Sequence, residues 1–306
     1  MTSVKDFLVE EQATRTDTGK GTFLFTDRYS VFDWGEMPDH IPGKGSTLCT
    51  MGAYNFEMLE DEGIPTHYRG IDVNGNTVPL AEVDEPPSRM NIELTQVPEL
   101  PYKNGSYDYE SYHSDGAENY LIPLEVIFRN RIPRGSSLRR RKDPSDVGFN
   151  YDDWPDEVIR LEEPIVEFST KYEEKDRYLD RGEAARIAGR ADLKNIEDLA
   201  HTVNQYLCER AQLSGMTHDD GKIECLYHRG EIKVADVVGT FDENRFTFQG
   251  HQLSKEVIRQ YYRSNQPAWL EAIDGAREQA KEEQHDDWRM LCDVTPDPLP
   301  ENVLQS

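Results

Sequence analysis

Segments typical of strands and of helices alternate along this chain without a regular repeat. Short apolar runs at residues 4–10 and 22–26 are joined by a Thr/Asp/Gly segment, which predicts a hairpin near the N-terminus. Neither the βαβ spacing of a doubly wound sheet nor the period of a solenoid occurs. We therefore expect an α+β fold, with a β-rich N-terminal lobe over residues 1–120 and a more helical, mixed α+β lobe over residues 121–306.

Three stretches have apolar residues at helical spacing. Residues 47–62 form the first predicted helix, which ends at glycine and proline stop signals. Residues 183–213 predict a second helical region, with a break expected near residues 189–192. Residues 254–291 predict further helix, interrupted near Pro267.

The last part of the expected N-terminal lobe differs in composition from the rest of the chain. Residues 71–120 are rich in Pro, Gly, Asp and Tyr, with a single strand predicted at 90–97. We expect this segment to be an elaborated surface insertion. The apolar run at 121–129 predicts a strand that follows it, and residues 222–237 predict a β-hairpin.

Charge limits the partners that this chain can have. It carries 59 acidic and 34 basic residues, a formal net charge of −25, but 36% hydrophobic residues are enough for a packed core. General binding to nucleic acids or anionic membranes is disfavoured. With only 12 Lys beside 22 Arg, the composition suggests a protein adapted to concentrated salt. An ordinary acidic protein is the alternative.

The four cysteines indicate a reducing compartment. They lie far apart, at positions 49, 208, 225 and 292, with no C-x-x-C pair. The first residues carry charges where a signal peptide needs an apolar run, and no stretch of about 18 apolar residues occurs. We therefore expect a cytoplasmic protein.

The densest group of cations is a candidate binding site. Seven Arg and Lys side chains fall within residues 129–142, around a Gly135-Ser136-Ser137 turn. Arginine side chains match phosphate oxygens in pairs, and backbone amides in a tight turn add further donors. A small phosphorylated ligand is the favoured interpretation, and ion pairing with acidic neighbours or contact with RNA is the alternative.

The predicted hairpin is a candidate metal site. With a three-residue loop at 228–230, Lys222, Glu224 and Asp236 would share one face of the hairpin. Two carboxylates of this kind suit Mg²⁺, which also takes oxygens from substrate phosphates. A surface hairpin with ordinary charges is the alternative, and a loop of two or four residues would move Asp236 to the opposite face.

Two weaker candidates complete the set. A strand ends at Asp27 and is followed by a Gly43-Lys44-Gly45 turn at a predicted helix start, where unpaired backbone amides favour anions. Most such turns are structural. The other candidate site is the end of a predicted strand, where Lys171 is followed by several acidic residues up to Asp176.

Together and in chain order, these segments resemble the SAICAR synthetase family from about residue 3 to residue 265. The resemblance is carried by TDRYSVFD with IPGKGS, by LIPLEVIFRNRIPRGSS, by EFSTKYEEKD and by DGKIE. The spacing from Glu224 to Asp236 and the later Asp242 to Arg245 also follow the family pattern. Each motif is modest alone, but their collinear order is specific. The resemblance implies a two-lobed fold with ATP bound between the lobes.

The resemblance also implies a reaction. Members of this family are ATP-dependent C–N ligases of purine biosynthesis, which join L-aspartate to the carboxylate of carboxyaminoimidazole ribotide through an acyl phosphate. ATP and Mg²⁺ are the implied cofactors, and the ribotide and L-aspartate are the implied small-molecule partners. No nucleic acid or membrane partner is implied, and a homo-oligomer is compatible with the family.

Individual roles follow from the same resemblance. It implies catalysis by Lys171, Asp176 and Lys222, nucleotide binding by Lys5, Lys222 and Glu224, and metal binding by Glu224 and Asp236. It also implies substrate binding by Arg129, Ser136 and Arg245 at the ribotide phosphate, and by Asp27, Ser30 and Lys44 around the aspartate and the carboxylate. The chain departs from the family pattern in several places. Thr2-Ser3 stand where the family has Gly-Lys, Lys175 replaces a His, and Val237 replaces an acid. One extra residue separates Arg129 from Gly135-Ser136, and the 71–120 insertion is longer than usual.

Two other functions stay open at this stage. One is a related ATP-dependent ligase or phosphotransferase that uses another amine or acid. The other is a non-catalytic ligand-binding or RNA-binding relative, since the N-terminal lysine pattern is incomplete.

Overall fold

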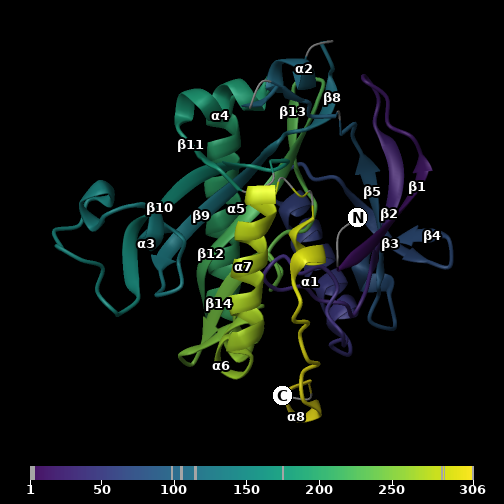
Figure 1. Ribbon diagram of the computed structural model, residues 1–306. Coiled ribbons are helices and arrows are strands. Elements are labelled where there is room, and N and C mark those ends of the chain that lie inside the picture. Colours follow the sequence, from purple (N-terminus) through teal and green to yellow (C-terminus); the bar gives the residue numbers. More distant parts are fainter. Residues whose placement is uncertain are drawn as a thin grey trace.

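The computed structural model describes residues 4–97, 99–103, 106–113, 116–173, 176–283, 285 and 287–304 (Figure 1). It combines two large antiparallel sheets and a two-stranded one, β6 (Tyr102–Lys103) with β7 (Ser106–Tyr107), with helices, so the predicted α+β class is confirmed. Lys175 and Thr2-Ser3, which depart from the family pattern, lie outside the described residues. No helix in the described part of the chain is long and apolar enough to cross a membrane.

The first sheet has five strands in the order β1-β2-β5-β3-β4. The strands are β1 (Lys5–Glu11), β2 (Gly19–Phe25), β3 (Tyr68–Val73), β4 (Asn76–Val78) and β5 (Arg89–Leu94), and helix α1 (Lys44–Asp61) packs on them. β1 and β2 pair as the expected hairpin, with Lys5 opposite Phe25. The predicted helix at 47–62 is confirmed as α1.

The expectation of a surface insertion over residues 71–120 is wrong for its first half. β5 lies between β2 and β3 in the sheet, and Met90 and Ile92 on it are buried. The strand predicted at 90–97 is confirmed as β5, but its place inside the sheet was not predicted, because pairing with β2 and β3 has no local signature in the sequence. The second half holds β6 (Tyr102–Lys103), β7 (Ser106–Tyr107) and α2 (Tyr109–His113).

The second sheet has eight strands. Six of them follow the order β11-β10-β9-β12-β14-β15, while β8 and β13 pair with the far end of β12. The bounds are β8 (Asn119–Leu121), β9 (Leu124–Ile132), β10 (Ile159–Thr170), β11 (Tyr178–Leu179), β12 (Met216–His228), β13 (Glu231–Ala235), β14 (Asn244–Phe248) and β15 (His251–Leu253). The predicted strand at 121–129 is therefore confirmed as part of β9.

The helices of the second half follow the sequence prediction. Helix α4 (Arg181–Ala188) ends at Gly189, which has a φ of 71°, and α5 (Leu193–Leu213) begins at the Asp192 cap. Helix α6 (Glu256–Asn265) ends before α7 (Pro267–Glu283), so the interruption at Pro267 is confirmed. Short turns of helix complete the chain: α3 (Leu138–Arg141), α8 (Glu301–Leu304) and 3₁₀ turns at Leu80–Glu82, Pro144–Val147 and Trp288–Leu291.

Backbone contacts join the two sheets where β13 ends. The His67 amide donates to the Val234 carbonyl at 3.0 Å, and the Val234 amide donates to the Pro65 carbonyl at 3.0 Å. One continuous core spans α1, α5 and both sheets, and a second core cluster joins the 29–37 segment to α6 and α7. The four cysteines are all free. The junction places the start of β1 beside the end of the β12–β13 hairpin.

The Gly43-Lys44-Gly45 turn has a structural explanation. Gly43 precedes α1 with a φ of 80°, a conformation that favours glycine. A Cβ on Gly45 would lie 2.8 Å from the carbonyl carbon of Thr26, because the helix start packs directly on the end of β2. Both glycines are needed to bring α1 against the sheet.

We expect Gly45→Ala to lower the free energy of unfolding by about 2 kcal/mol, because backbone must move to admit the methyl group. Gly275→Ala is the matched control. Gly275 is also helical, nothing lies within 4 Å of its Cβ position, and its φ is ordinary. That variant should gain about 0.5–1 kcal/mol. Urea unfolding of both variants checks the pair, and equal effects would contradict the packing explanation.

Candidate active site

The β12–β13 hairpin differs in register from the prediction. His228 pairs with Glu231, which leaves a two-residue loop at Arg229-Gly230, and Glu224 pairs with Ala235. The expected three-residue loop is wrong. Both loop residues have positive φ values, as the tight hairpin turn requires.

Asp236 nevertheless lies close to Glu224. In this register a continued strand would direct Asp236 to the opposite face of the hairpin. Instead, β13 ends at Ala235 and Asp236 adopts a φ of 62°, which turns the chain. The proximity of the two carboxylates raises the pKa of Glu224, in addition to the larger effect of burial. The expected pair therefore forms, by a local turn and not by the predicted register.

Each of these two carboxylates pairs with a lysine. The Lys171 ammonium contacts the Glu224 carboxylate, and the Lys5 ammonium contacts that of Asp236. Burial opposes ionisation of Asp236, but Lys5 and Lys171 together outweigh it and the pKa of Asp236 is lowered. Burial likewise disfavours the charged Lys171, yet Glu224 raises its pKa. Residues predicted for three different roles thus meet in one place.

Lys222 lies beside these pairs, held by two carboxylates that the sequence analysis did not single out. Its ammonium donates to Glu125 at 2.5 Å and lies 3.2 Å from Glu243. Burial opposes the charge, but these partners raise the pKa of Lys222 well above its ordinary value. We call the resulting group the ion-pair cluster; it consists of Lys5, Glu125, Lys171, Lys222, Glu224, Asp236 and Glu243.

Asp176 lies near the ion-pair cluster. Its side chain is exposed, but surrounding protein and then the charge of Glu125 raise its pKa, with a further contribution from Asp33. Lys222 and Lys171 act in the opposite direction. The prediction that Lys171 and Asp176 belong to one site is consistent with this mutual electrostatic influence.

A second group of charges surrounds Arg129, which is only 3% exposed. Its guanidinium contacts Asp220 at 3.3 Å, Ser136 Oγ at 3.4 Å and Glu167 at 2.8 Å. Arg245 donates to both oxygens of the same Asp220. Arg129, Ser136 and Arg245 were each predicted to bind a phosphate, and Asp220 brings the two arginines together. We call Arg129, Ser136, Glu167, Asp220 and Arg245 the arginine cluster.

The other cations of the basic run do not join one site. Arg131 pairs with Asp219 at 2.9 Å, and Arg139 donates to the backbone carbonyls of Ile132, Pro155 and Glu157. Arg134 is exposed. The interpretation of residues 129–142 as a single phosphate site is therefore wrong for these members, since strand alternation and the turn at 133–137 direct them differently.

Arg141 does reach the arginine cluster. It donates to both oxygens of Glu167 at 3.0 Å and lies 3.2 Å from the centre of the Tyr178 ring. The Tyr178 hydroxyl in turn contacts Arg129 at 3.2 Å and Ser137 at 3.1 Å. Tyr178 is a contact that sequence reasoning missed, because only pairing of β11 with β10 brings it near Arg129.

The segment before α1 carries the three remaining predicted residues. Both carboxylate oxygens of Asp27 accept backbone amides, from Gly43 at 3.0 Å and from Gly45 at 2.9 Å. Asp27 therefore anchors the start of α1. Lys44 pairs with Asp242 at 2.7 Å. Ser30 lies partly buried in the loop between Asp27 and Lys44.

Strand β12 aligns the two clusters. Asp220, Lys222 and Glu224 alternate along it and so share one face, with successive members about 7 Å apart. Asp220 belongs to the arginine cluster, and the other two belong to the ion-pair cluster. This face therefore presents paired guanidinium groups next to lysines and carboxylates, a set suited to a phosphorylated substrate and a second, metal-bound phosphate.

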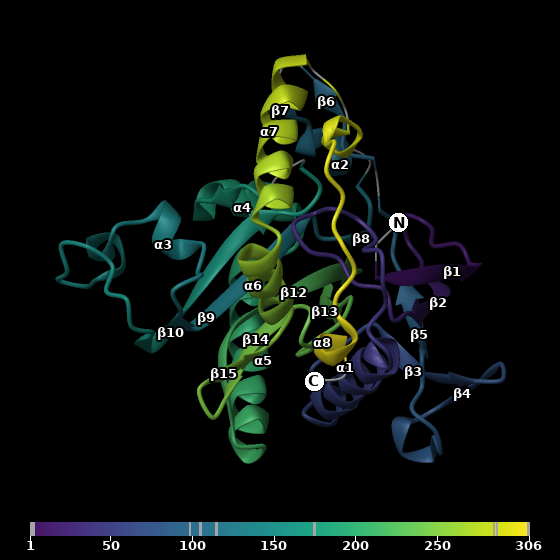
Figure 2. The same ribbon diagram turned by 60° about the horizontal axis from the view of Figure 1, so that its bottom comes forward.

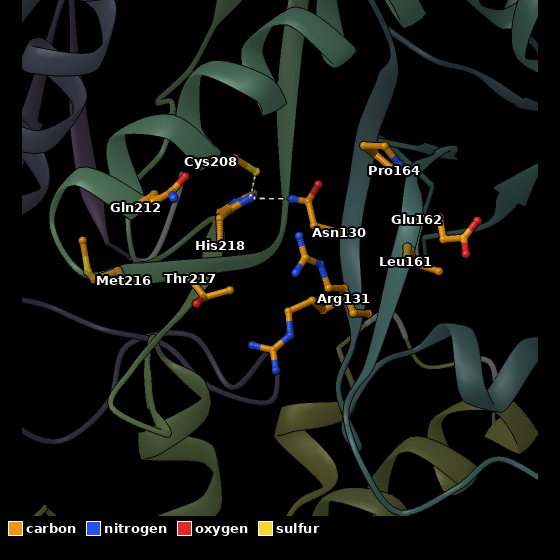
Figure 3. A pocket seen from close by; sticks show the side chains of 11 residues that line it. Asn130, Arg131, Leu161, Glu162, Pro164, Cys208, Gln212, Met216, Thr217 and His218 are labelled. Carbon is orange, nitrogen blue, oxygen red and sulfur yellow. Dashed lines mark hydrogen bonds between the residues drawn. The ribbon is translucent and has the colours of Figure 1, made fainter.

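A pocket of about 590 Å³ lies elsewhere, on the side of β9 and β12 that faces α5 (Figure 3). It opens where a break in the β9–β10 register at residues 161–164 leaves Asn130 without a strand partner. The Asn130 amide donates to His218 at 2.9 Å, and the His218 ring also bonds Asn244 at 2.9 Å. Asn130 and Arg129 are strand neighbours and face opposite ways, so this pocket is separate from the arginine cluster.

The fold and the two clusters define an α+β enzyme that handles phosphorylated small molecules. The family model for SAICAR synthetase matches residues 13–275. A relative from Archaeoglobus fulgidus is 40% identical across the whole chain and 89% of its own length. The phosphoribosylaminoimidazole-succinocarboxamide synthase of Thermoplasma acidophilum is 32% identical over 79% of this chain and 77% of its own.

Solved structures agree with the sequence relatives. A SAICAR synthetase in complex with ADP superposes with a TM-score of 0.61 at 25% identity, covering 85% of this chain and 88% of that one. The Saccharomyces cerevisiae SAICAR synthase complexed with SAICAR shares the fold, with a TM-score of 0.63 at 21% identity over all of this chain and 88% of that one. The chain belongs to the SAICAR synthetase family, and it is a ligase of purine biosynthesis.

Proposed function

We propose that this enzyme joins L-aspartate to the carboxylate of carboxyaminoimidazole ribotide and converts ATP to ADP and phosphate. The observation that carries the proposal is the shared face of β12, which aligns the arginine cluster with the ion-pair cluster. A ribotide has a phosphate at one end and the reacting carboxylate at the other, so it needs two such sites side by side. The ADP-bound relative supports nucleotide use.

The arginine cluster suits the ribotide phosphate. Arg129 and Arg245 provide donors in fixed planes, and Ser136 adds a hydroxyl. Asp220 already neutralises part of their charge, so the ligand must supply enough negative charge to attract both guanidinium groups. A phosphate monoester does so better than a carboxylate.

The carboxylates of the ion-pair cluster fit a magnesium ion. The described residues contain no group of three or more His, Cys, Asp and Glu arranged as a complete metal site. Mg²⁺ usually takes one or two protein carboxylates and completes its shell with water and phosphate oxygens. Glu224 and Asp236 could provide the carboxylates, and ATP could provide the phosphate oxygens. When bound, the ion would neutralise charge on the ATP phosphates. Lys5 would then be released from Asp236, and Lys171 from Glu224. Lys5 could contact the same phosphates, together with the neighbouring Lys222.

The chemistry needs no protein nucleophile. A carboxylate oxygen of the ribotide attacks the γ-phosphorus of ATP, and ADP leaves. The amine of aspartate then attacks the acyl carbon, loses a proton, and phosphate leaves with one oxygen of the former carboxylate. Lys171 and Lys222 would stabilise negative charge on the transferred phosphoryl group, and Asp176 would orient the imidazole.

The segment from Asp27 to Lys44 would border the aspartate. Ser30 and Lys44 can contact a carboxylate directly, whereas Asp27 would act by fixing the start of α1. We also propose a cytoplasmic location, which the four free cysteines support.

The test is turnover with the named substrates. The enzyme with ATP, Mg²⁺ and the ribotide should form the succinocarboxamide only when L-aspartate is present, and ADP should appear in equal amount. Each other amino acid is supplied in turn as the control. ADP release at the same rate without aspartate would overturn the proposal in favour of a phosphotransferase, and absence of turnover in wild type would favour a non-catalytic relative.

A further inference from the structure

The loop from Tyr29 to Asp39 holds an unusual backbone conformation. Phe32 and Asp33 follow each other with φ values of 57° and 59°, a region that side chains other than glycine rarely adopt. Two such residues in a row persist only where surrounding structure fixes them. The charge of Asp33 also contributes to the raised pKa of Asp176, so this loop lies within electrostatic reach of a residue predicted to be catalytic.

One side chain of α7 contacts both strained residues. Arg277 donates to the Phe32 carbonyl at 2.6 Å and to the Asp33 carboxylate at 2.9 Å. Its guanidinium also lies over the Trp288 ring, 4.7 Å from the centroid. Arg277 thereby links the loop to the chain that follows α7.

Aromatic packing fixes the same loop from the C-terminal side. The Trp269 ring makes edge contacts with Phe32 at 5.8 Å and Trp34 at 5.5 Å between centroids, and Trp34 packs on Trp288 at 6.0 Å. Trp269 is almost fully buried, at 1% exposure. These rings pack on Phe32 and Trp34 of the loop and hold it against α7 and the residues that follow.

Residues near the C-terminus also contact the 29–39 loop. Asp39 accepts the Tyr29 hydroxyl at 2.7 Å and the Leu299 backbone amide at 3.0 Å. The Tyr262 hydroxyl donates to the Asp297 carbonyl at 3.1 Å. We name residues 288–304 the C-terminal strap, which runs beside α7 in both ribbon views (Figures 1 and 2). The family match ends at residue 275, so Arg277 and the strap lie beyond it.

We infer that Arg277 and the C-terminal strap position the 29–39 loop, and thereby set the affinity for the substrate that this loop borders. Arg277 is a positioning residue, because it reaches the site only through Phe32 and Asp33. The identity of that substrate, L-aspartate, rests on the proposed function. The loop conformation itself does not.

The test compares full-length Arg277→Ala with wild type. Amide hydrogen exchange of residues 29–39 should accelerate, while exchange in β9 and β12 stays the same. The KM for L-aspartate should rise about tenfold, the effect of losing hydrogen bonds from a charged group, with little change in kcat or in the KM for ATP. Arg277→Lys keeps the charge and one donor group, so it should restore part of the affinity.

Two further variants complete the design. Lys281→Ala removes an exposed cation from the same helix and should change neither exchange nor KM. Asp39→Ala removes the link between Tyr29 and the strap, and should reproduce the loop effect. Unchanged loop exchange in Arg277→Ala, or an unchanged KM for aspartate, would overturn the inference. A wild-type enzyme without aspartate-dependent turnover would instead overturn the proposed function.

Discussion

Replacing Glu224 by glutamine should lower kcat by about a thousandfold, within the range seen when a charged or donor group at the reacting atoms is lost. The substitution keeps the shape of the side chain but removes its charge. Lys171 would also lose its ion pair, because its ammonium contacts the Glu224 carboxylate directly. Initial rates at saturating ATP, and at several Mg²⁺ concentrations, measure the effect.

The Mg²⁺ dependence separates two explanations of that loss. If Glu224 helps to bind the ion, the concentration of Mg²⁺ needed for half-maximal rate should rise in Glu224→Gln. Glu231→Gln is the matched control, since Glu231 lies on the same hairpin with an exposed side chain. Wild-type activity in Glu224→Gln would contradict the assignment of the metal and nucleotide site.

Replacing Arg245 by alanine should raise the KM for the ribotide about a hundredfold. A charge-assisted hydrogen bond to phosphate contributes on the order of 1.5–3 kcal/mol, and the loss also leaves the buried Asp220 with fewer partners. The KM for ATP should change little, because Arg245 does not belong to the ion-pair cluster. Steady-state kinetics with each substrate varied in turn provide the measurement.

Arg181→Ala serves as the control for Arg245→Ala. Arg181 is an exposed arginine paired with Glu197 on neighbouring helices, so its loss should leave all kinetic constants near wild type. A KM for ATP that rises as much as the KM for the ribotide would show that the arginine cluster binds the nucleotide instead. That result would require the two substrates to exchange places along β12.

Periodicity and stop signals in the sequence were sufficient for most of the helices and strands. The break between α4 and α5 was predicted because Gly189 and the Asp192 cap leave local signals. β5 was predicted as a strand, but its place in the first sheet was not, because that place depends on pairing with β2 and β3. Strand pairing over such distances has no local signature.

The candidate site was predictable in its residues more than in its geometry. The resemblance named Glu224 and Asp236, but only the turn at Asp236 explains how they meet in a hairpin of the observed register. Glu125 and Glu243 escaped notice because each is an ordinary acid in a very acidic chain. Their importance appears only when β9 and the 240–244 turn bring both to Lys222. Burial of charge, and not residue type, distinguishes them.

The most direct test of the central claim follows an oxygen atom. The ribotide is labelled with ¹⁸O in its carboxylate and incubated with enzyme, ATP, Mg²⁺ and L-aspartate, and the released phosphate is analysed by mass spectrometry. Attack of that carboxylate on ATP predicts one labelled oxygen in each phosphate formed. Unlabelled phosphate from a reaction that still makes the succinocarboxamide would contradict activation of the carboxylate by phosphorylation.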